Sequence, residues 1–419
     1  MKVELLKTQK GSGKVYISGS KNSCLPILAI SLLTNKKMIL HNVPNISDVN
    51  DMLEMLSYIG VKIKKEKNKV MLKRKKVKNE LLLTQVSKIR GSYYLFPGLI
   101  HNNEKVKVIY PGGCSFTNRP IDYHFNMFKK TNVTIEEQEN IIVFYKNKLK
   151  NITIKFNKPT IGATINTILH SVLIKGTTKI LNQPIEPEIY EVVNCLRLMG
   201  ANIYINKEEI IIKGGKKLGG VEYYICPDRI EAGSYILLSS VLEKDVTIYN
   251  VNKKTIEYLE PYLLKMNIKY IYNKSNIKVI GSKKIKGINL NVDYYPSFPT
   301  DLQPIVTSVL TQAQTQSIIV DNIYEDRVSH IYELNKLNAK ITYENKQIII
   351  NPSTLMSGEV YAKDLRCGFA LIVAGAVTKH CFINNFEVLD RGYERIIEKL
   401  YNIGIQINII NWNKKMSVI

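Results

Sequence analysis

The sequence lacks the features that mark small secreted, zinc-binding or membrane-spanning proteins. Its six cysteines are scattered along 419 residues without a CxxC pair, so we expect neither a disulfide framework nor a zinc site. No apolar segment of the signal-peptide kind stands near Met1. The longest apolar runs, Leu25 to Leu33 and Ala370 to Val377, are far shorter than the ~20 residues that span a bilayer. We therefore expect a cytoplasmic protein that does not enter the membrane.

Glycine-rich nucleotide loops and acidic residues are also scarce. No GxxxxGK[ST] or GxGxxG segment precedes an expected helix, so folds that bind nucleotides through such a loop gain no support. Asp and Glu number 36 against 59 Lys and Arg, which gives a formal charge of +23. This excess favours anionic partners, but it does not distinguish a small anion from a nucleic acid. We expect no metal and no cofactor.

One nine-residue pattern occurs six times. It resembles the end of a helix followed by a short strand, and its sixth residue is always Gly or Asn, the two residues that most readily take the left-handed conformation ending a helix. Successive copies are 66 to 72 residues apart. The six residues at that position are Gly60, Asn132, Gly200, Asn267, Asn338 and Gly404.

Each repeat contains more than this pattern. A second strand follows the first after a polar turn, as in a β-hairpin. Upstream lies another apolar helix and its strand, for example 22–33 with 38–42 and 162–174 with 178–182. The unit is thus helix, strand, helix, strand, strand. Six such units exceed one hydrophobic core, so we expect an α/β (α+β) protein of two three-unit domains joined between Lys213 and Asp228.

Polar and charged residues stand where the helices are expected to begin. Helix N-termini attract phosphate and carboxylate, and added Lys or Arg strengthens that attraction. A cap or a surface salt bridge is the alternative for each residue alone. The residues at first-helix starts are Lys21, Asn22, Arg90, Thr160, Gly162, Asp301, Asp364 and Arg366, and those at second-helix starts include Arg119, Arg327 and Arg391.

Three residues call for a choice between two roles. Cys114 lies in a Gly-rich polar segment near Arg119, where a thiol is reactive, whereas the other five cysteines stand in apolar surroundings typical of a core. Asp301 suits a helix N-cap, and a general base is the alternative. His124 follows Pro120 closely enough to reach a ligand, although a structural role is the simpler interpretation.

The sequence resembles the bacterial UDP-N-acetylglucosamine enolpyruvyl transferases of peptidoglycan synthesis along nearly its whole length. The resemblance is carried by SGSKNSCLPIL (18–28), PGGCSFTNRPID (111–122), TIGATINTIL (160–169), EPEI (186–189), PDRIEAGSY (227–235), FPTDLQP (298–304), DLRCGFALIVAG (364–375) and DRGYERI (390–396). It implies two inside-out α/β-barrel domains of three repeats each, one formed by 20–229 and the other by 1–19 with 230–419. It also implies an active site in the cleft between them.

The resemblance implies that phosphoenolpyruvate and UDP-N-acetylglucosamine give enolpyruvyl-UDP-N-acetylglucosamine and phosphate through a tetrahedral ketal. Lys21, Arg119 and Arg391 would hold phosphoenolpyruvate, and Asp301 would be the base. Cys114 would be the loop thiol that acts as an acid and that fosfomycin alkylates. The full implied substrate-binding set is Lys21, Asn22, Arg90, Arg119, Pro120, Asp122, His124, Thr160, Gly162, Asp301, Ile323, Tyr324, Arg327, Asp364, Arg366 and Arg391.

The sequence departs from the family at two places, and rival interpretations remain. Ser115 to Asn118 replace a small, Gly-containing run, which bears on loop closure, and Tyr295 and Ser297 stand where the family has His and Gly. Enolpyruvylshikimate-phosphate synthase shares the fold, but its Lys-Ser and Gly-Asn-Ala-Gly-Thr motifs are missing. Two further rivals are a nucleic-acid-binding protein and an inactive paralogue. The oligomeric state, monomer or weak oligomer, is left open.

Overall fold

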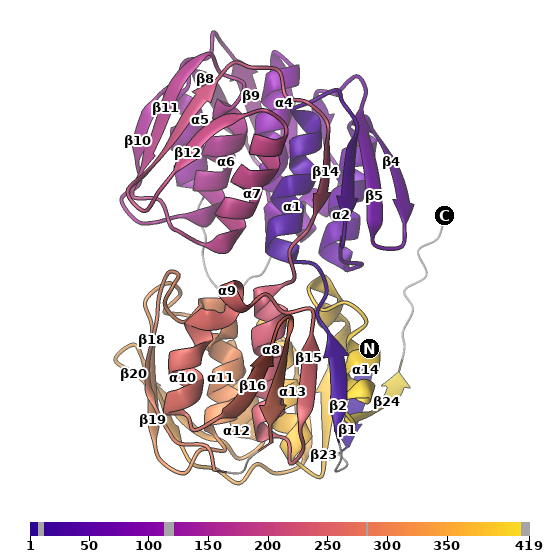
Figure 1. Cartoon of the computed structure of the whole chain (residues 1–419), viewed down its shortest axis with the longest axis vertical. Coiled ribbons are helices and arrows are strands. Elements are labelled where there is room, and N and C mark those ends of the chain that lie inside the picture. Colours follow the sequence, from indigo (N-terminus) through magenta and orange to yellow (C-terminus); the bar gives the residue numbers. More distant parts are fainter. Residues whose placement is uncertain (7–11, 113–120, 282–283, 412–419) are drawn as a thin grey trace. The chain divides into compact units, whose positions relative to one another are not determined.

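The computed structural model describes residues 1–6, 12–112, 121–281 and 284–411. The chain forms two compact units, which we call the N-terminal unit (Gly19–Cys226) and the C-terminal unit (Met1–Ser18 with Pro227–Ile419). The chain therefore passes from one unit to the other twice, at Ser18–Gly19 and at Cys226–Pro227 (Figure 1).

All six predicted helix-ending residues have the left-handed backbone that the Gly/Asn pattern requires. The φ angles are 107° at Gly60, 73° at Asn132, 94° at Gly200, 60° at Asn267, 66° at Asn338 and 77° at Gly404. The three asparagines also donate a side-chain hydrogen bond to a backbone oxygen 16 or 17 residues further along the chain. The prediction of six repeated helix ends is confirmed.

Each repeat contributes to a four-stranded sheet in which the first two strands are parallel and the others antiparallel. In the N-terminal unit the three sheets are β14-β3-β5-β4 (Val221–Tyr224, Met38–His41, Lys69–Arg74, Val61–Glu66), β6-β7-β9-β8 (Glu80–Leu81, Lys105–Ile109, Ile141–Lys146, Val133–Gln138) and β10-β11-β13-β12 (Thr153–Lys155, Gly176–Leu181, Glu209–Gly214, Asn202–Ile205). In the C-terminal unit they are β2-β15-β17-β16 (Gly13–Tyr16, Val246–Tyr249, Asn276–Ile280, Lys269–Asn273), β18-β19-β21-β20 (Asn289–Val292, Ser317–Asp321, Gln347–Asn351, Lys340–Glu344) and β22-β23-β1-β24 (Gly358–Tyr361, His380–Asn384, Lys2–Leu6, Gln406–Asn411).

The sheets correct the five-element repeat in two respects. Each has a fourth strand, parallel to the strand after the first helix, that the sequence pattern did not predict. The expectation of a complete hairpin after Gly404 is wrong within the described residues, because β24 pairs with β1 from the start of the chain. The sixth unit is therefore closed by the N-terminus.

Asparagines fix the added parallel strand in four of the sheets. Asn42, Asn182, Asn250 and Asn385 follow the central strands with φ angles of 55–58°. Their side-chain amides donate to the backbone oxygens just after the parallel strand or strand end, at Ile225, Phe156, Ile17 and Ala362, over 2.6–2.9 Å. One residue type thus makes the same turn and the same cross-strand bond in four repeats.

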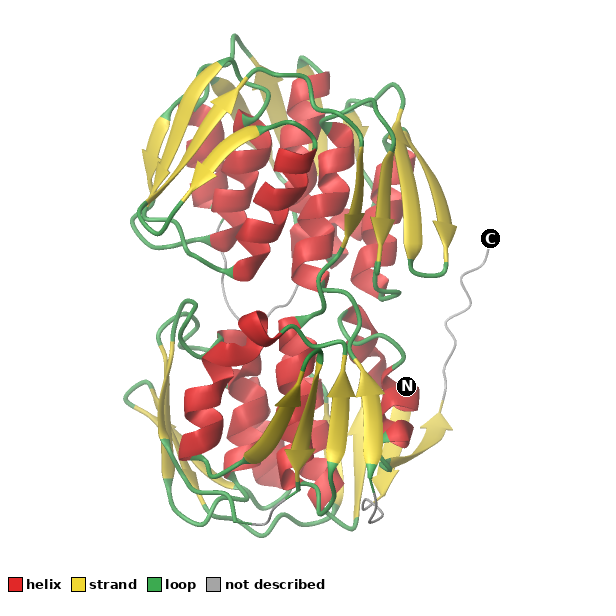
Figure 2. Ribbon diagram, viewed as in Figure 1, coloured by secondary structure: helices red, strands yellow, loops and turns green. Residues whose placement is uncertain are grey.

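In each unit the helices lie inside and the sheets outside (Figure 2). The first helix of each repeat is apolar around most of its surface, which suits burial on every side; every residue of α8, for instance, is buried. In the C-terminal unit α8, α11 and α13 pack against one another. The first-helix segments are α1 (Lys21–Ala29) with η1 (Ile30–Leu32), η2 (Arg90–Leu95) with α4 (Phe96–Asn102), α6 (Ile161–Ser171), α8 (Arg229–Val241), η4 (Thr300–Leu302) with α11 (Gln303–Leu310), and α13 (Leu365–Val377).

The second helices pack against inner helices and sheet strands on one side and expose other residues, such as Leu198 and Tyr332, to solvent. They are α2 (Ser47–Tyr58), α5 (Asp122–Lys130), α7 (Pro187–Leu198), α9 (Lys253–Ile256) with η3 (Glu257–Leu259) and α10 (Glu260–Lys265), α12 (Ser329–Lys336), and η5 (Phe386–Arg391) with α14 (Ile396–Asn402); the short α3 (Gln85–Lys88) precedes η2. Pro187 is the first residue of α7, a position that suits proline.

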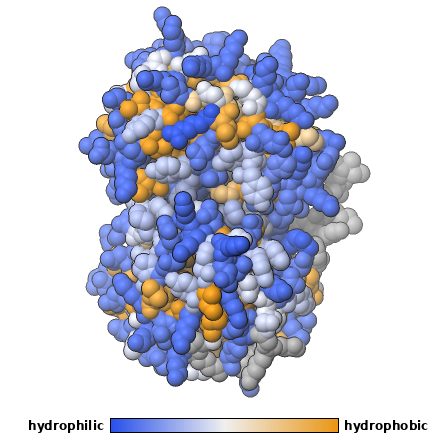
Figure 3. Space-filling view, viewed as in Figure 1, coloured by the Kyte–Doolittle hydropathy of each residue, from blue (hydrophilic) through white to orange (hydrophobic). Residues whose placement is uncertain are grey.

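Hydrophilic residues cover most of the molecular face seen in Figure 3, and hydrophobic residues form scattered groups on it. No helix in the described part of the chain is long and apolar enough to cross a bilayer.

Candidate functional site

Asp301 is the centre of a charged cluster in the C-terminal unit. One carboxylate oxygen accepts a hydrogen bond from Arg327 Nη2 at 3.0 Å, and the other accepts from Arg366 Nη2 at 2.8 Å. Both guanidinium groups are buried, whereas the Asp301 side chain is 27% exposed. The cluster therefore presents one carboxylate to the outside and fixes its two oxygens from within.

Arg366 remains charged despite its burial. Burial by itself lowers the pKa of Arg366, but the negative charge of Asp301, followed by the effects of Tyr393 and Asp228, more than offsets it and raises the pKa above its ordinary value. A permanent positive charge beside Asp301 stabilises its ionised form. The pair can thus act as a fixed anion–cation unit around neutral pH.

Arg327 is held by the residue before Asp301. Its Nη1 donates to the backbone oxygen and to the hydroxyl of Thr300, over 2.5 and 2.9 Å. The Thr300 hydroxyl donates in turn to Asp321, at the end of β19, over 2.7 Å. The other Asp321 oxygen accepts the backbone N–H groups of Ile323 and Tyr324 at 2.9 Å each. This series of hydrogen bonds connects the predicted substrate residues Ile323 and Tyr324 to Asp301.

The N-cap interpretation of Asp301 is wrong. Asp301 is the second residue of η4, the residue at the N-cap is Pro299, and the two Asp301 oxygens accept from guanidinium groups. Asp364, in contrast, is a cap: it accepts from the N–H groups of Arg366 and Cys367 at the start of α13, over 2.8 and 3.0 Å. Asp301 thus has its two oxygens on cations, whereas Asp364 Oδ1 accepts from two helix N–H groups.

Lys21 begins α1 in the N-terminal unit and forms an ion pair with the start of α2. Its Nζ lies 2.7 Å from a carboxylate oxygen of Asp48, and the two side chains are 14% and 5% exposed. Asn22, the next residue, is half-buried. Asp48 is not among the predicted residues; an acidic residue in the first turn of the helix that ends at Gly60 was the available signal.

His124 and Gly162 lie against Tyr93, and the charge of Arg90 acts on His124. The ring centres of Tyr93 and His124 are 4.3 Å apart, and His124 Nδ1 bonds the Asn166 side-chain amide at 2.8 Å. Burial, followed by the charge of Arg90, lowers the pKa of His124 to about 3. A Cβ at Gly162 would lie 2.6 Å from the Tyr93 hydroxyl oxygen, so a larger residue would not fit there. His124 is thus a neutral, packed side chain, which favours its structural role.

The remaining predicted residues are placed individually. Thr160 is the N-cap residue of α6 without a side-chain capping bond. Asp122 is exposed at the start of α5, and Arg391 is half-buried at the end of η5. Cys114, Arg119 and Pro120 lie outside the described residues.

One statement about the cysteines needs correction. Cys24, Cys195, Cys367 and Cys381 are buried, as expected for core residues, but Cys226 is only half-buried. It lies outside any helix or strand, where the chain leaves the N-terminal unit, and its Sγ is 3.6 Å from the Ser23 hydroxyl. Strand β14 ends at Tyr224, two residues before Cys226. Cys226 is therefore not a strand residue packed into the core.

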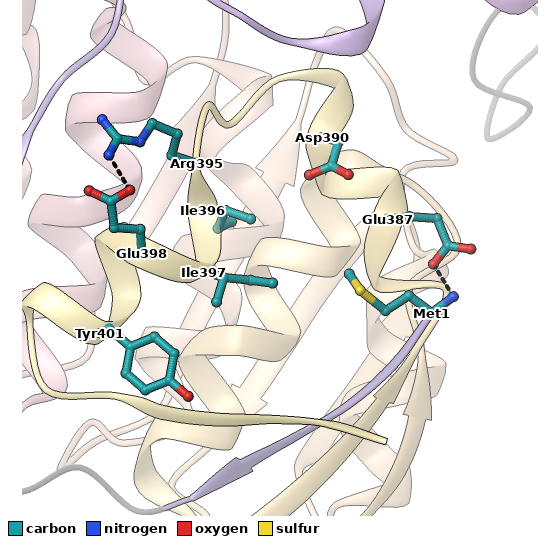
Figure 4. A pocket seen from close by; sticks show the side chains of 8 residues that line it. All are labelled: Met1, Glu387, Asp390, Arg395, Ile396, Ile397, Glu398 and Tyr401. Atoms are coloured by element: carbon teal, nitrogen blue, oxygen red, sulfur yellow. Dashed lines mark hydrogen bonds and ion pairs between the residues drawn. The ribbon is translucent and has the colours of Figure 1, made fainter. Parts of the chain in front are cut away.

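A surface hollow of about 600 Å³ lies at the start of α14 in the C-terminal unit. Figure 4 shows two ion pairs in it, between the Met1 amino group and Glu387 and between Arg395 and Glu398, with Asp390 also at its edge. None of the predicted site residues lines it. No group of three or more His, Cys, Asp and Glu side chains that could hold a metal occurs among the residues described.

The chain is similar to known proteins along nearly its whole length. Residues 6–400 match the family described as EPSP synthase (3-phosphoshikimate 1-carboxyvinyltransferase). The UDP-N-acetylglucosamine 1-carboxyvinyltransferase of Pelagibacter ubique is 37% identical over 98% of this chain and 100% of that protein. The enzyme of the same name from Halothermothrix orenii is 36% identical over 94% and 96%.

Solved structures show the same fold at lower identity. The enolpyruvyl transferase NikO from Streptomyces tendae has a TM-score of 0.87 and 20% identity, with 97% of this chain and 98% of that chain covered. An EPSP synthase from Acinetobacter baumannii has a TM-score of 0.76 and 16% identity, with 97% and 99% covered.

Proposed function

The chain belongs to the enolpyruvyl transferase family, and we propose that it transfers the enolpyruvyl group of phosphoenolpyruvate to the 3-hydroxyl of UDP-N-acetylglucosamine. The names of the similar proteins point to two different acceptor molecules for the enolpyruvyl group. The relatives at 36–37% identity are named for UDP-N-acetylglucosamine, whereas the EPSP synthase structure is only 16% identical. This difference supports the nucleotide sugar as acceptor in this chain.

The observation that carries the proposal is the Asp301 carboxylate held between two guanidinium groups. A general base needs a fixed position and an exposed oxygen. Asp301 has two hydrogen bonds that fix its plane and a side chain that is 27% exposed. We assign it the proton of the sugar 3-hydroxyl.

The reaction then proceeds by addition and elimination. The sugar oxygen bonds to C2 of phosphoenolpyruvate as Asp301 takes the hydroxyl proton, and C3 receives a proton from an acid, which we assign to Cys114. The resulting ketal loses a C3 proton and expels phosphate, and the C2–C3 double bond forms again. Lys21, Arg119 and Arg391 would hold the phosphate and carboxylate groups, since cations bind these anions strongly.

Some of the predicted substrate contacts receive less support. Asp364 is occupied as a helix cap and His124 by its contacts with Tyr93 and Asn166. Asn22, Arg90, Thr160, Gly162, Ile323 and Tyr324 remain candidates for the sugar and uridine. The proposal places the enzyme in the cytoplasm, where its free thiols would stay reduced.

Product identification tests the proposal. The protein is incubated with both substrates, and the product is examined by proton NMR. We expect two vinylidene protons and a sugar 3-position linked through an ether to the enolpyruvyl group. Unchanged UDP-N-acetylglucosamine, with the same preparation active on shikimate 3-phosphate, would contradict the assignment of the acceptor.

A further inference from the structure

Tyr393 contacts Arg366 at the terminal nitrogen that does not bond Asp301. It stands between η5 and α14 and is 1% exposed. Its ring packs against Phe369, with ring centres 4.6 Å apart. The packing fixes the ring, and therefore also the position of its hydroxyl group.

The hydrogen bonds around this hydroxyl have a defined direction. Ser234 donates its own hydroxyl proton to the backbone oxygen of Ile230 at 2.7 Å, the usual bond of a serine inside a helix. Ser234 Oγ must then accept from Tyr393 across their 2.8 Å contact. The Tyr393 oxygen in turn accepts from Arg366 Nη1 at 3.1 Å. Burial raises the pKa of Tyr393 to about 12, so the phenol keeps the proton it donates.

The bonds form one directed series from α8 to Asp301. Arg366 Nη1 is fixed by Tyr393, and Arg366 Nη2 donates to Asp301. A guanidinium group is planar, so fixing one of its nitrogens also orients the other. The location of the Asp301 carboxylate therefore depends on a phenol that does not contact it.

We propose that Tyr393 is a positioning residue for the transfer reaction: its hydroxyl, held by Ser234, orients Arg366 and through it the base Asp301. The proposal rests on the proposed function for its effect on turnover. Its structural part, the orientation of Arg366, can be measured separately.

The matched control is Tyr235, a second buried tyrosine of the same core. It is 0% exposed and its ring also contacts Phe369, at 5.4 Å between centres. Within the described residues its hydroxyl has no hydrogen-bond partner. Tyr235→Phe thus removes a buried hydroxyl beside the same phenylalanine without breaking the series.

The first experiment compares Tyr393→Phe with Tyr235→Phe in steady-state assays. Hydrogen bonds to charged groups are worth enough that losing one changes an equilibrium by about tenfold or more. We expect Tyr393→Phe to lower kcat about tenfold while KM for each substrate changes less than about twofold, and Tyr235→Phe to retain kcat. Equal kcat in the two variants, or a change in KM alone, would overturn the proposal.

A double-variant cycle tests the series itself. If Ser234 acts through Tyr393, Ser234→Ala lowers kcat less than Tyr393→Phe, and the double variant is no slower than Tyr393→Phe alone. Losses that multiply would show that the two residues act separately and would overturn the directed series.

A third measurement does not depend on turnover. Hydrogen exchange of the Arg366 guanidinium protons is followed by ¹⁵N NMR, with the resonance assigned by its loss in Arg366→Lys. We expect exchange about tenfold faster in Tyr393→Phe than in the wild type and Tyr235→Phe. Unchanged exchange would overturn the proposal even in an active enzyme. Faster exchange in a protein that transfers no enolpyruvyl group would instead place the error in the proposed function.

Discussion

In the C-terminal unit three of the predicted site residues belong to one hydrogen-bonded cluster, whereas in the N-terminal unit the predicted residues lie in separate contacts. Asp301 accepts hydrogen bonds from both Arg327 and Arg366. Each guanidinium group also donates to one further residue, Arg327 to Thr300 and Arg366 to Tyr393. Lys21 pairs with Asp48, and His124 packs with Tyr93 at another place.

Under the proposed function, these two sets of residues have different tasks. A group that takes a proton must be fixed to a fraction of an ångström, and the connected cluster provides that. A group that holds a phosphate needs charge and reach, which the flexible side chain of a lysine provides. The following predictions test this comparison, from the largest expected effect to the smallest.

The largest effect concerns thiol reactivity. Burial raises the pKa of Cys195, Cys367 and Cys381 to about 12, about three units above an ordinary thiol, so their thiolate populations are about a thousandfold smaller. We expect fosfomycin to modify Cys114 alone, faster when UDP-N-acetylglucosamine is bound. Mass spectrometry of the treated protein would locate the adduct.

Half-buried Cys226 tests whether solvent exposure alone is enough for a cysteine to react with fosfomycin. Cys226→Ser should leave the modification rate unchanged, whereas Cys114→Asp should resist the drug and keep activity, since a carboxylic acid can still donate a proton. An adduct on Cys226, or none on the 111–120 segment with sugar nucleotide present, would contradict the assignment of Cys114.

The second effect concerns Asp301. Asp301→Asn keeps the size of the side chain and removes the base, so we expect turnover to fall at least about 100-fold, as for loss of a general base. Asp228→Asn is the control: Asp228 caps α8 in the same unit, and Asn caps equally well. Phosphate release would measure both. Near-normal turnover in Asp301→Asn would exclude it as the base.

The third effect concerns Lys21. Lys21→Met should lower turnover about 10- to 100-fold, because a charged hydrogen bond to the substrate is lost. It also leaves Asp48 without this cation, which should cost about 3 kcal/mol of stability. Adding Asp48→Asn should restore most of the unfolding free energy but not the turnover. Recovery of turnover together with stability would show that Lys21 serves only the fold.

The smallest effect is a difference in acid sensitivity between the units. Burial lowers the pKa of His101 to about 4, of His124 to about 3 and of His170 well below its ordinary value, all in the N-terminal unit; in the C-terminal unit it lowers the pKa of His330 to about 3. The unfolded chain binds these protons below pH 6.5 and the folded chain does not, so stability falls as the pH falls from 6.5 towards 4.

At pH 5, His101 and His124 each cost about 2 kcal/mol, and His170 adds a loss in the same direction. We expect hydrogen–deuterium exchange at pH 5 relative to pH 7 to show a larger loss of protection in the N-terminal unit. Equal losses in both units would contradict the account of the buried histidines.

The sequence predicted features that depend on local backbone chemistry. The six Gly or Asn helix ends were predictable because few other residues take φ near +60° to +110°. The fourth strand of the β14-β3-β5-β4 sheet was not, because β14 pairs with β3 across about 180 residues and such pairing leaves no local pattern. The partner of β24 was missed for the same reason, since β1 is at the other end of the chain.

In the candidate site, too, residues could be predicted from the sequence but their distant contacts could not. Asp301 was predicted as a residue of interest, but its cap role was wrong because Arg366, 65 residues further along, bonds its carboxylate. Tyr393 lies within the DRGYERI segment but was not singled out, since its bond to Ser234 spans 159 residues. Contacts between distant repeats decide what a helix-start residue does, and the repeats themselves look alike in sequence.

Acceptor choice is the most direct test of the proposed function. Phosphate release is measured with phosphoenolpyruvate and either UDP-N-acetylglucosamine or shikimate 3-phosphate, each with the wild type and with Asp301→Asn. We predict rapid release with UDP-N-acetylglucosamine that depends on both substrates and on Asp301, and no release with shikimate 3-phosphate. Release with shikimate 3-phosphate, or with neither acceptor, would contradict it.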